Sequence, residues 1–344
     1  MSIPPTCAHS DPLLDVLYGQ VMRLRRRRLE RQPQRQRRLA RPVISVGNLS
    51  VGGTGKTPVV AAIAQRLIDS GERPSILSRG YARIDAPDGV VVVSDGQNIQ
   101  ATIERAGDEP LMLARQVPRT AVCVSPDRYL AGTLAEHQLG CTVHILDDGF
   151  QHIALARNLD VLVTTIGEIP NGRMMPLGRL REPSDAAARA HFLVVTDATS
   201  GAASAEAWSL GIQQSCGAAR HLAAPVHIVG NREPGTGIGE PGSGNRVLAV
   251  AGIAHPQRFF DALKAADWNV VQTMAFKDHH RYTVADIAAI DAKAKSANAD
   301  VVLTTDKDAV RLESLALPFE VYRVPLRVEF DPPDALMASV MAIL

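Results

Sequence analysis

The chain has 344 residues, a formal net charge of +1, 46% hydrophobic residues and 4% aromatic residues. This length favours two domains, and this composition is typical of a soluble α/β protein. The four cysteines lie far apart without a Cys-x-x-Cys pair, and no stretch approaches the roughly 18 consecutive apolar residues of a membrane-spanning helix. These features argue against a zinc site, a disulfide framework and an integral membrane anchor, and they favour the cytoplasm.

The N-terminal segment carries a concentrated basic charge. Residues 21–41 contain ten arginines and one glutamate, so the rest of the chain is net acidic. Just upstream, Asp11 and Pro12 form a favourable helix start. Apolar residues then recur at helical spacing, at Leu13, Leu17, Val21 and Leu24. The pattern predicts a basic amphipathic helix on an anionic membrane surface, with packing on the protein's own core, a nucleic-acid arm and a targeting peptide as alternatives.

A glycine-rich turn connects the β-branched run Pro42–Val46 to a helical pattern that starts near Val59. The core of the turn is Gly52, Gly53, Thr54, Gly55, Lys56 and Thr57. Backbone N–H groups of such a turn bind phosphates, Lys56 reaches the β- and γ-phosphates, and the Thr57 hydroxyl joins a Mg²⁺ shell. Ser50 stands where the regular pattern has its first glycine. Because the rest is intact, we predict a loop that binds ATP and Mg²⁺ rather than a merely flexible turn.

Short apolar runs and helical patterns alternate after this loop. We predict a helix over Val59–Ser70 that Gly71 ends, followed by further strands. These strands are Pro74–Leu77, Val90–Val93, Ala121–Val124, Val143–Leu146, Val161–Thr165 and Phe192–Thr196. The alternation predicts a mostly parallel sheet with helices on both faces and a functional site at the carboxyl ends of the strands.

Asp108 lies just before a predicted helix over Pro110–Gln116. Asp is a favoured N-cap residue and Pro suits the first turn of a helix, so a structural cap is the simpler hypothesis. The alternative is a general base that takes a proton from an attacking hydroxyl. The residues alone leave both hypotheses open.

Two acids, Asp147 and Asp148, follow the apolar strand Val143–Leu146. Proteins with a phosphate-binding loop place a carboxylate beside the metal at such a strand end. The structural alternative is that these acids cap the following turn. Beside a phosphate-binding loop, the metal-site prediction is favoured.

Two loops carry arginines that suit a phosphate group. One is the loop Asn171–Pro183, which contains Arg173, Arg179 and Arg181, and the other holds Arg79 just after a predicted strand. A guanidinium group binds phosphate oxygens in a bidentate manner, so these loops are candidates for holding the phosphate of an acceptor. Any single one of these arginines is better explained as an ordinary surface residue.

Residues 231–245 are rich in Gly and Pro and predict a linker or a long loop. Beyond them the pattern of strands and helices restarts, which indicates a second, smaller α/β unit. Its predicted strands are Val247–Val250, Val270–Phe276, Val301–Thr305 and Val321–Val328, and its helices are Pro256–Ala266 and Val284–Ser296. We therefore divide the chain into an arm at residues 1–41, a core at residues 42–230 and a smaller domain at residues 231–344.

Two adjacent histidines, His279 and His280, follow the strand that ends at Phe276. They precede Thr283 and Asp286, which have the spacing of a capping box. Adjacent histidines in a loop are surface residues, metal ligands or groups that orient a carboxylate or phosphate. A metal site is the least favoured, because no partners occur at ligand spacing.

These blocks in this order resemble the tetraacyldisaccharide 4′-kinase family of the lipid A pathway. The matching stretches are Val46–Pro58, Leu77–Arg83, Gly107–Pro110, Ser125–Gly132, Ile145–His152, Asn171–Pro183, Phe276–Tyr282 and Thr304–Asp308. The resemblance implies ATP-dependent phosphorylation of the 4′-hydroxyl of tetraacyldisaccharide 1-phosphate, which gives lipid IVA. It also implies work at the cytoplasmic face of a Gram-negative inner membrane, with that surface and the lipid as partners and no nucleic acid.

The resemblance implies an α/β fold with a P-loop NTPase-like core of mostly parallel sheet, joined to a smaller α/β domain, with the active site in the cleft between them. Asp108 becomes the general base, oriented by His279, while Asp147 and Asp148 lie near the metal. Further implied site residues are Arg79, Glu109, Arg128, Gln151, His152, Asn171, Arg179 and Arg181.

The main alternative is a membrane-associated switch ATPase of the ParA/MinD type, which has a similar loop and can carry an amphipathic membrane helix. Those proteins have a signature lysine just before the two glycines, and this chain has Val51 there. A third hypothesis, a regulator that binds nucleic acid through its basic arm, lacks interleaved aromatic residues and a recognisable reader fold. The sequence therefore favours the kinase.

Overall fold

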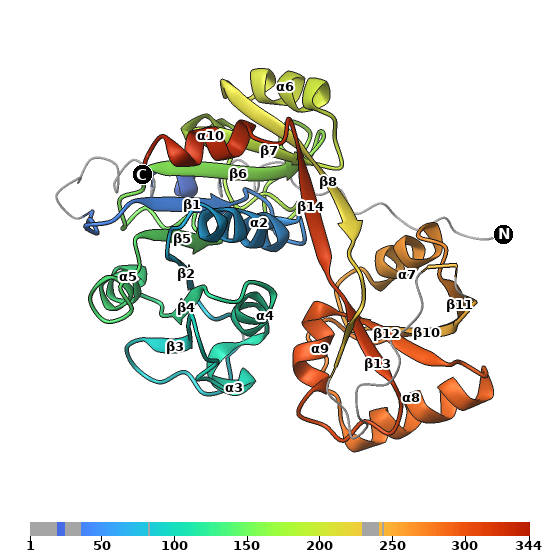
Figure 1. Cartoon of the computed structure of the whole chain (residues 1–344). Helices are drawn as coiled ribbons and strands as arrows, with labels where there is room; N and C mark the ends of the chain where they lie inside the picture. Colours follow the sequence, from blue (N-terminus) through green and yellow to red (C-terminus); the bar gives the residue numbers. More distant parts are fainter. Residues whose placement is uncertain (1–18, 25–35, 82, 229–240, 243) are drawn as a thin grey trace. The chain divides into compact units, whose positions relative to one another are not determined.

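The computed structural model describes residues 19–24, 36–81, 83–228, 241–242 and 244–344 (Figure 1). The chain forms two compact units, each assembled from segments that are distant in the sequence. The first unit comprises Met1–Lys56, Asp148–Ala218 and Phe330–Leu344, and the second comprises Thr57–Asp147 and Ala219–Glu329. Within the described residues, no helix combines the length and the apolar character that crossing a membrane requires.

The first unit is built on parallel strands. They are β1 (Val43–Gly47), β6 (Leu159–Thr165), β7 (Phe192–Thr196) and β8 (Gln214–Leu222). β1 pairs with β6, β6 with β7 and β7 with β8, all in the parallel sense. All residues of β1 and β7 are buried, as expected for parallel strands that are covered on both faces. Helical elements of this unit include η2 (Ser184–Arg189), α6 (Ser200–Ser209) and α10 (Ala335–Met341).

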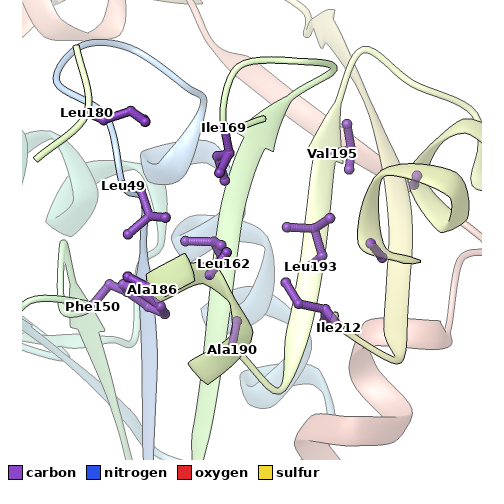
Figure 2. Close-up of a cluster of buried hydrophobic side chains, with 13 residues drawn as sticks. Leu49, Phe150, Leu162, Ile169, Leu180, Ala186, Ala190, Leu193, Val195 and Ile212 are labelled. Atoms are coloured by element: carbon purple, nitrogen blue, oxygen red, sulfur yellow. The ribbon is translucent and has the colours of Figure 1, made fainter. Parts of the chain in front are cut away.

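One hydrophobic cluster of this unit holds two loops in place. Figure 2 shows Leu49, from the glycine-rich loop, and Leu180, from the arginine loop, in the same cluster as Leu162 and Leu193 of the sheet. Leu49 and Leu180 are almost fully buried, and burying a leucine contributes roughly 1.5–3 kcal/mol. The packing of the sheet thus fixes where both loops leave it.

The second unit contains a group of four paired strands and, separate from it, a smaller sheet. In the first part, β5 (Val143–Asp147) and β4 (Ala121–Val124) pair in parallel with β2 (Pro74–Ser78), while β3 (Val91–Asp95) pairs antiparallel with β4. Its helices are α2 (Lys56–Asp69), α3 (Ile103–Ala106), α4 (Asp108–Gln116) and α5 (Arg128–His137). The predicted strands and helices of this part are confirmed to within a few residues at each end.

The smaller sheet has the order β11-β10-β12-β13-β9. Its strands are β9 (Val226–His227), β10 (Arg246–Ala251), β11 (Asn269–Ala275), β12 (Val301–Thr305) and β13 (Val321–Val324), and its helices are α7 (Pro256–Ala265), α8 (Val284–Ser296) and α9 (Asp306–Leu312). Successive residues of β10 enter different clusters: Leu248 packs with Ile290 of α8, whereas Val247 packs with Phe260 of α7. This alternation places one helix on each face of a mostly parallel sheet.

The prediction of one continuous strand over Val321–Val328 is wrong. The structure has two strands there, β13 and β14 (Leu326–Asp331), on either side of Pro325. Proline has no N–H group to donate to a ladder, which favours a break at this point. β13 pairs with β12, whereas β14 contains the boundary at which the chain returns to the first unit.

The predicted N-terminal helix falls only partly within the described residues, of which 19–24 are helical. In this turn Arg23 Nε lies 3.0 Å from Asp185 Oδ2, while Val21 and Leu24 are 52% and 65% exposed. Residues 36–41 belong to the folded unit: the Arg37 N–H donates to the Ala154 carbonyl at 3.0 Å, and Leu39 is buried. The last residues of the predicted arm therefore pack on the first unit.

Candidate functional site

The glycine-rich loop forms a compact turn that ends where α2 begins. Gly52 and Gly55 have φ values of +111° and +89°, a region that side chains other than hydrogen disfavour. The Thr54 N–H donates to the Gly52 carbonyl at 3.1 Å, and the Thr54 hydroxyl accepts from Asn48 Nδ2 at 3.0 Å. Since the first turn of α2 contains no acidic residue, its N-terminal N–H groups favour an anion.

Ser50, the departure from the regular loop pattern, has its own partner. Its hydroxyl donates to Glu168 Oε1 at 2.7 Å, and the residue is 2% exposed. A glycine could not make this bond, so the serine ties the start of the loop to the segment after β6.

The arginine loop runs alongside the phosphate-binding loop. The Val51 N–H donates to the Arg179 carbonyl at 2.8 Å, and the Arg181 N–H donates to the Leu49 carbonyl at 2.6 Å. The Arg179 side chain also donates from Nε to the Val51 carbonyl at 2.9 Å. These bonds bring two predicted phosphate-binding arginines to the predicted nucleotide loop.

Gly52→Ala is expected to lower the free energy of unfolding by about 1–3 kcal/mol, the usual cost of a strained backbone conformation. A Cβ atom at Gly52 would also clash with Arg179 Nη2, so that side chain would have to move. Gly53→Ala is the matched control, because a Cβ atom there meets no heavy atom within 4 Å. Urea denaturation of the ligand-free proteins measures the difference. Equal denaturation midpoints for the two variants would contradict this description of the loop.

Asp148 lies between two cations. Its Oδ1 atom is 3.4 Å from Lys56 Nζ, and its Oδ2 atom is 2.8 Å from Arg181 Nη1. Burial raises the pKa of Asp148, but the charges of Lys56 and Arg181 outweigh burial and hold that pKa below its ordinary value. The residue has a φ of +52°, which turns the chain immediately after β5. Asp148 is therefore an ionised carboxylate that orients Lys56.

The side-chain amide of Gln151 is held by hydrogen bonds to the glycine-rich loop and to the arginine loop. Its Nε2 atom donates to the Asn48 carbonyl at 2.9 Å and to Glu182 Oε1 at 3.1 Å. The oxygen of the same amide accepts from Arg181 Nη1 at 3.4 Å. Glu182, which the sequence analysis did not single out, is itself held by Arg189 Nη2 at 2.9 Å.

A second cluster forms around Asp108 in the other unit. Asp108 is the first residue of α4, whose N-cap is Gly107 and has no side-chain cap, so the cap hypothesis is wrong. The Asp108 carboxylate instead contacts His279, with 2.8 Å between Oδ2 and Nδ1, and accepts a hydrogen bond from Arg311. Burial raises the pKa of Asp108, but Arg311 and His279 together lower it below its ordinary value. This ionised carboxylate can accept a proton.

The two adjacent histidines have different surroundings. His280 stacks on the ring of Phe276 at 4.7 Å between centroids, and its Nε2 atom lies 3.1 Å from Asp286 Oδ2. Asp286 belongs to the predicted capping box with Thr283, which is confirmed. His280 thus supports the start of α8, whereas His279 reaches Asp108.

The remaining predicted residues take different positions. Glu109 lies 3.9 Å from Lys307 Nζ, next to the Asp108 cluster. Arg79 is exposed after β2, and the buried Arg128 begins α5 and donates from Nη1 to the Pro126 carbonyl at 3.3 Å. The last two are His152, whose N–H donates to the Gly149 carbonyl at 2.8 Å, and Asn171, whose N–H donates to the Gly167 carbonyl at 3.1 Å.

Residues 12–344 match the tetraacyldisaccharide-1-P 4′-kinase family, LpxK. The chain belongs to this family. The match spans both units and confirms the family that the sequence motifs indicated.

Members of the LpxK family resemble the chain along nearly its whole length. The tetraacyldisaccharide 4′-kinase of Geobacter sulfurreducens is 41% identical over 332 residues, which cover 95% of this chain and 91% of that protein. The enzyme of the same name from Geobacter metallireducens is 39% identical over 337 residues, covering 96% and 97%. The crystal structure of "apo" form LpxK from Aquifex aeolicus in complex with ATP shares 30% identity and a TM-score of 0.76 over 96% of this chain and 97% of that one.

These likenesses confirm the predicted α/β fold with its large, mostly parallel sheet and the kinase class. They give no support to the ParA/MinD-type alternative. That alternative is therefore set aside in favour of the LpxK family.

The residues present fit the nucleotide and Mg²⁺ that a kinase of the LpxK family requires. Mg²⁺ prefers oxygen ligands and is commonly bound by one or two carboxylates together with substrate phosphates. The Thr57 hydroxyl and the carboxylates of Asp147 and Asp148 are donors of this kind, and Asp147 accepts from Ser78 Oγ at 3.4 Å. Over the part of the chain that the structure describes, no group of three or more His, Cys, Asp or Glu could hold a metal. A Mg²⁺ ion that shares phosphate ligands does not require such a group.

Lys307 and Arg311, which α9 places beside His279 and Asp108, were not predicted as site residues from the sequence. α9 has only seven residues, of which four are charged, so the sequence contains no apolar repeat that would predict this helix. The matching stretch Thr304–Asp308 was the available signal, but no role had been attached to it.

Proposed function

We propose that this chain transfers the γ-phosphate of ATP to the 4′-hydroxyl of tetraacyldisaccharide 1-phosphate, giving lipid IVA. The observation that carries the proposal is the bonding of Asp108, whose carboxylate faces His279 and Arg311 instead of capping α4. A half-buried, ionised carboxylate of this kind suits a general base for an attacking hydroxyl.

The nucleotide end of the proposal rests on the loop Gly52–Thr57. Its backbone N–H groups and Lys56 would bind the phosphates of ATP, and Asp148 would hold Lys56 in position at 3.4 Å. Thr57, Asp147 and Asp148 would hold Mg²⁺, which supplies neutralisation of charge on the transferring phosphoryl group when bound.

The acceptor end of the proposal rests on Asp108 and His279. Asp108 would accept the proton of the 4′-hydroxyl, while His279 would fix the direction of its carboxylate. The residues that would contact the acceptor and its phosphate are Arg79, Glu109, Arg128, Gln151, His152, Asn171, Arg179 and Arg181. Among them, Arg179 and Arg181 are supported by their bonds to the phosphate-binding loop.

We further propose that the chain works peripherally at the cytoplasmic face of the inner membrane and does not bind nucleic acid. A tetraacylated acceptor leaves a bilayer at a cost of roughly 0.8 kcal/mol for each buried CH₂ group, so the enzyme must meet it at the surface. We retain the division into an arm (1–41), a core (42–230) and a smaller domain (231–344), and the arm would provide the contact. Its described turn exposes Val21 and Leu24 while Arg23 binds Asp185.

Val21→Asp combined with Leu24→Asp is expected to weaken binding of the full chain to vesicles that contain anionic lipid. Apolar side chains in the interface and basic residues near the head groups both favour binding, and the substitutions oppose both effects. Cosedimentation measures vesicle binding, and a comparison of low and high salt separates the electrostatic part. Exposed charges are screened within about 8 Å at physiological ionic strength. The matched control is Val284→Asp on α8, where the native valine is 80% exposed. Vesicle binding that survives the double substitution would exclude this turn as the anchor.

The proposed function is tested with γ-labelled ATP and detergent-solubilised disaccharide 1-phosphate. We expect label to enter the lipid fraction in proportion to the protein present. A switch ATPase would instead release all label as inorganic phosphate, with or without the lipid. That outcome would overturn the proposal.

A further inference from the structure

Helix α9 carries two cations, Lys307 and Arg311, to the Asp108 cluster. α9 packs against α4, and Asp108 is the first residue of α4. Arg311 reaches Asp108 and Lys307 reaches His279. Both cations belong to the same short helix, so one element fixes both members of the proton-accepting pair.

Asp308, a fully buried residue of the same helix, holds the side chain of Arg311 in place. One oxygen of Asp308 accepts from the Gly252 N–H at 2.9 Å and from the Thr305 hydroxyl at 2.7 Å. The other oxygen accepts from the Tyr282 hydroxyl at 3.1 Å and from Arg311 Nη1 at 3.3 Å. Four donors saturate this carboxylate, so Asp308 holds one nitrogen of Arg311 in a fixed place.

The other terminal nitrogen of Arg311, Nη2, donates to Asp108 Oδ2. A guanidinium group is rigid and planar, so fixing Nη1 also fixes the direction of Nη2. His279 Nδ1 contacts the same oxygen of Asp108 at 2.8 Å. Among the described residues, the side-chain hydrogen bonds of Asp108 therefore converge on Oδ2, which leaves Oδ1 to receive a proton.

Lys307 and Asp108 contact opposite ring nitrogens of His279 and together favour one position of the ring proton. The Lys307 Nζ atom lies 3.1 Å from His279 Nε2 and 3.1 Å from Asp278 Oδ1. An ammonium group donates and cannot accept, so its contact requires Nε2 to accept. On the other side of the ring, the Asp108 carboxylate lies 2.8 Å from Nδ1 and accepts its proton in a hydrogen bond, whereas the donor Arg311 Nη2 lies farther from Nδ1, at 3.4 Å. His279 also has a φ of +58°, so the loop backbone helps to set the ring position.

We propose that Lys307 and Arg311 are positioning residues for phosphoryl transfer: Lys307 holds His279 as the Nδ1-protonated tautomer, and Arg311, anchored by Asp308, directs the Asp108 carboxylate at the attacking hydroxyl. The inference rests on the proposed function, because it specifies how the proton acceptor of that reaction is held. The transition state of phosphoryl transfer is loose, so orientation of the acceptor hydroxyl matters more than the strength of the base.

Lys307→Met is expected to lower kcat about 10–100-fold, the loss typical of removing an outer partner that orients a histidine ring, with the KM for ATP unchanged. Lys307→Arg keeps a donor and should restore most of the rate. The control is Lys295→Met on α8, where the lysine side chain is 75% exposed. A wild-type kcat for Lys307→Met, or equal losses for Met and Arg, would overturn the role of Lys307.

The tautomer can be observed without activity by ¹⁵N NMR of the histidine-labelled full chain, with His279→Asn used to identify the signal. We expect a protonated Nδ1 and an unprotonated Nε2 in the wild type, and a mixture of tautomers in Lys307→Met. A wild-type proton on Nε2 would overturn the assignment. If the wild type transfers no phosphate to the disaccharide, the proposed function fails, and this measurement still tests the positioning separately.

The pH profile tests Arg311. The groups that face Asp108 and His279 are Glu109 on α4, Tyr81, Asp278 in the histidine loop, and Lys307, Asp308 and Arg311 on α9. Arg311 lowers the pKa of Asp108, which keeps the carboxylate ionised to lower pH. In Arg311→Gln that pKa should rise, so the acid limb of kcat should move up by about 1–3 pH units.

Arg311→Lys keeps the charge but cannot bridge Asp308 and Asp108, so it should retain the wild-type acid limb with a lower kcat. An unmoved limb in Arg311→Gln, or a wild-type kcat in Arg311→Lys, would overturn the role of Arg311. If Arg311→Gln does not fold, Arg311→Lys and the Lys307 variants still decide the proposal.

Discussion

Asp108→Asn should lower kcat for phosphate transfer by about 10²–10⁴-fold and leave the KM for ATP unchanged. The amide cannot take the proton of the acceptor hydroxyl, whereas its oxygen can still accept from Arg311. Because the side chain does not cap α4, the helix should keep its start. Steady-state transfer kinetics and a melting curve of the same preparation measure both effects.

The matched control for this variant is Asp85→Asn, a carboxylate with an exposed arginine partner, Arg105, at 3.6 Å. This control should keep the wild-type kcat, since exposed pairs contribute little. An Asp108→Asn protein that melts earlier but transfers phosphate at the wild-type rate would reduce Asp108 to a structural residue.

Lys56→Ala should lower kcat by at least about 10²–10³-fold, the typical cost of losing one preorganised group that stabilises transition-state charge. The substitution would also remove one of the two cations beside Asp148, and Arg181 would remain as the other. Some ATP binding should remain, because the backbone N–H groups of the loop are unchanged. Transfer kinetics and equilibrium binding of ATP separate the two effects.

Lys264→Ala, at an exposed position in the last turn of α7, provides the control for loss of a lysine. It should match the wild type in both measurements. Transfer by Lys56→Ala at a rate close to that of the control would contradict the assignment of the phosphate-binding loop.

The sequence predicted the elements whose signal is local. The apolar runs of β1, β5 and β7 are short and β-branched, and the structure confirms them nearly residue for residue. The capping box at Thr283 and Asp286 is likewise encoded by two residues at a fixed spacing. Such features depend on neighbours in the chain, so one sequence is enough to find them.

The partners of the site residues could not be predicted in the same way. Asp108 carries the local signal of a helix cap, and only the packing of α9 and the histidine loop gives its carboxylate other partners. Arg311 is 203 positions away from Asp108 in the chain, a separation at which residue spacing carries no information. Pro325 is a local signal for a break between strands, but the β-branched residues on both sides of it favoured one continuous strand.

The most direct test of the account is the position of the phosphate in the product of purified full chain, ATP and disaccharide 1-phosphate. Phosphorus–proton correlation NMR of the extracted lipid should show one new phosphate monoester, at the 4′ position. An acceptor with hydrogen in place of the 4′-hydroxyl should give no product. A new phosphate at any other position, or ATP consumption that leaves the lipid unchanged, would contradict the account.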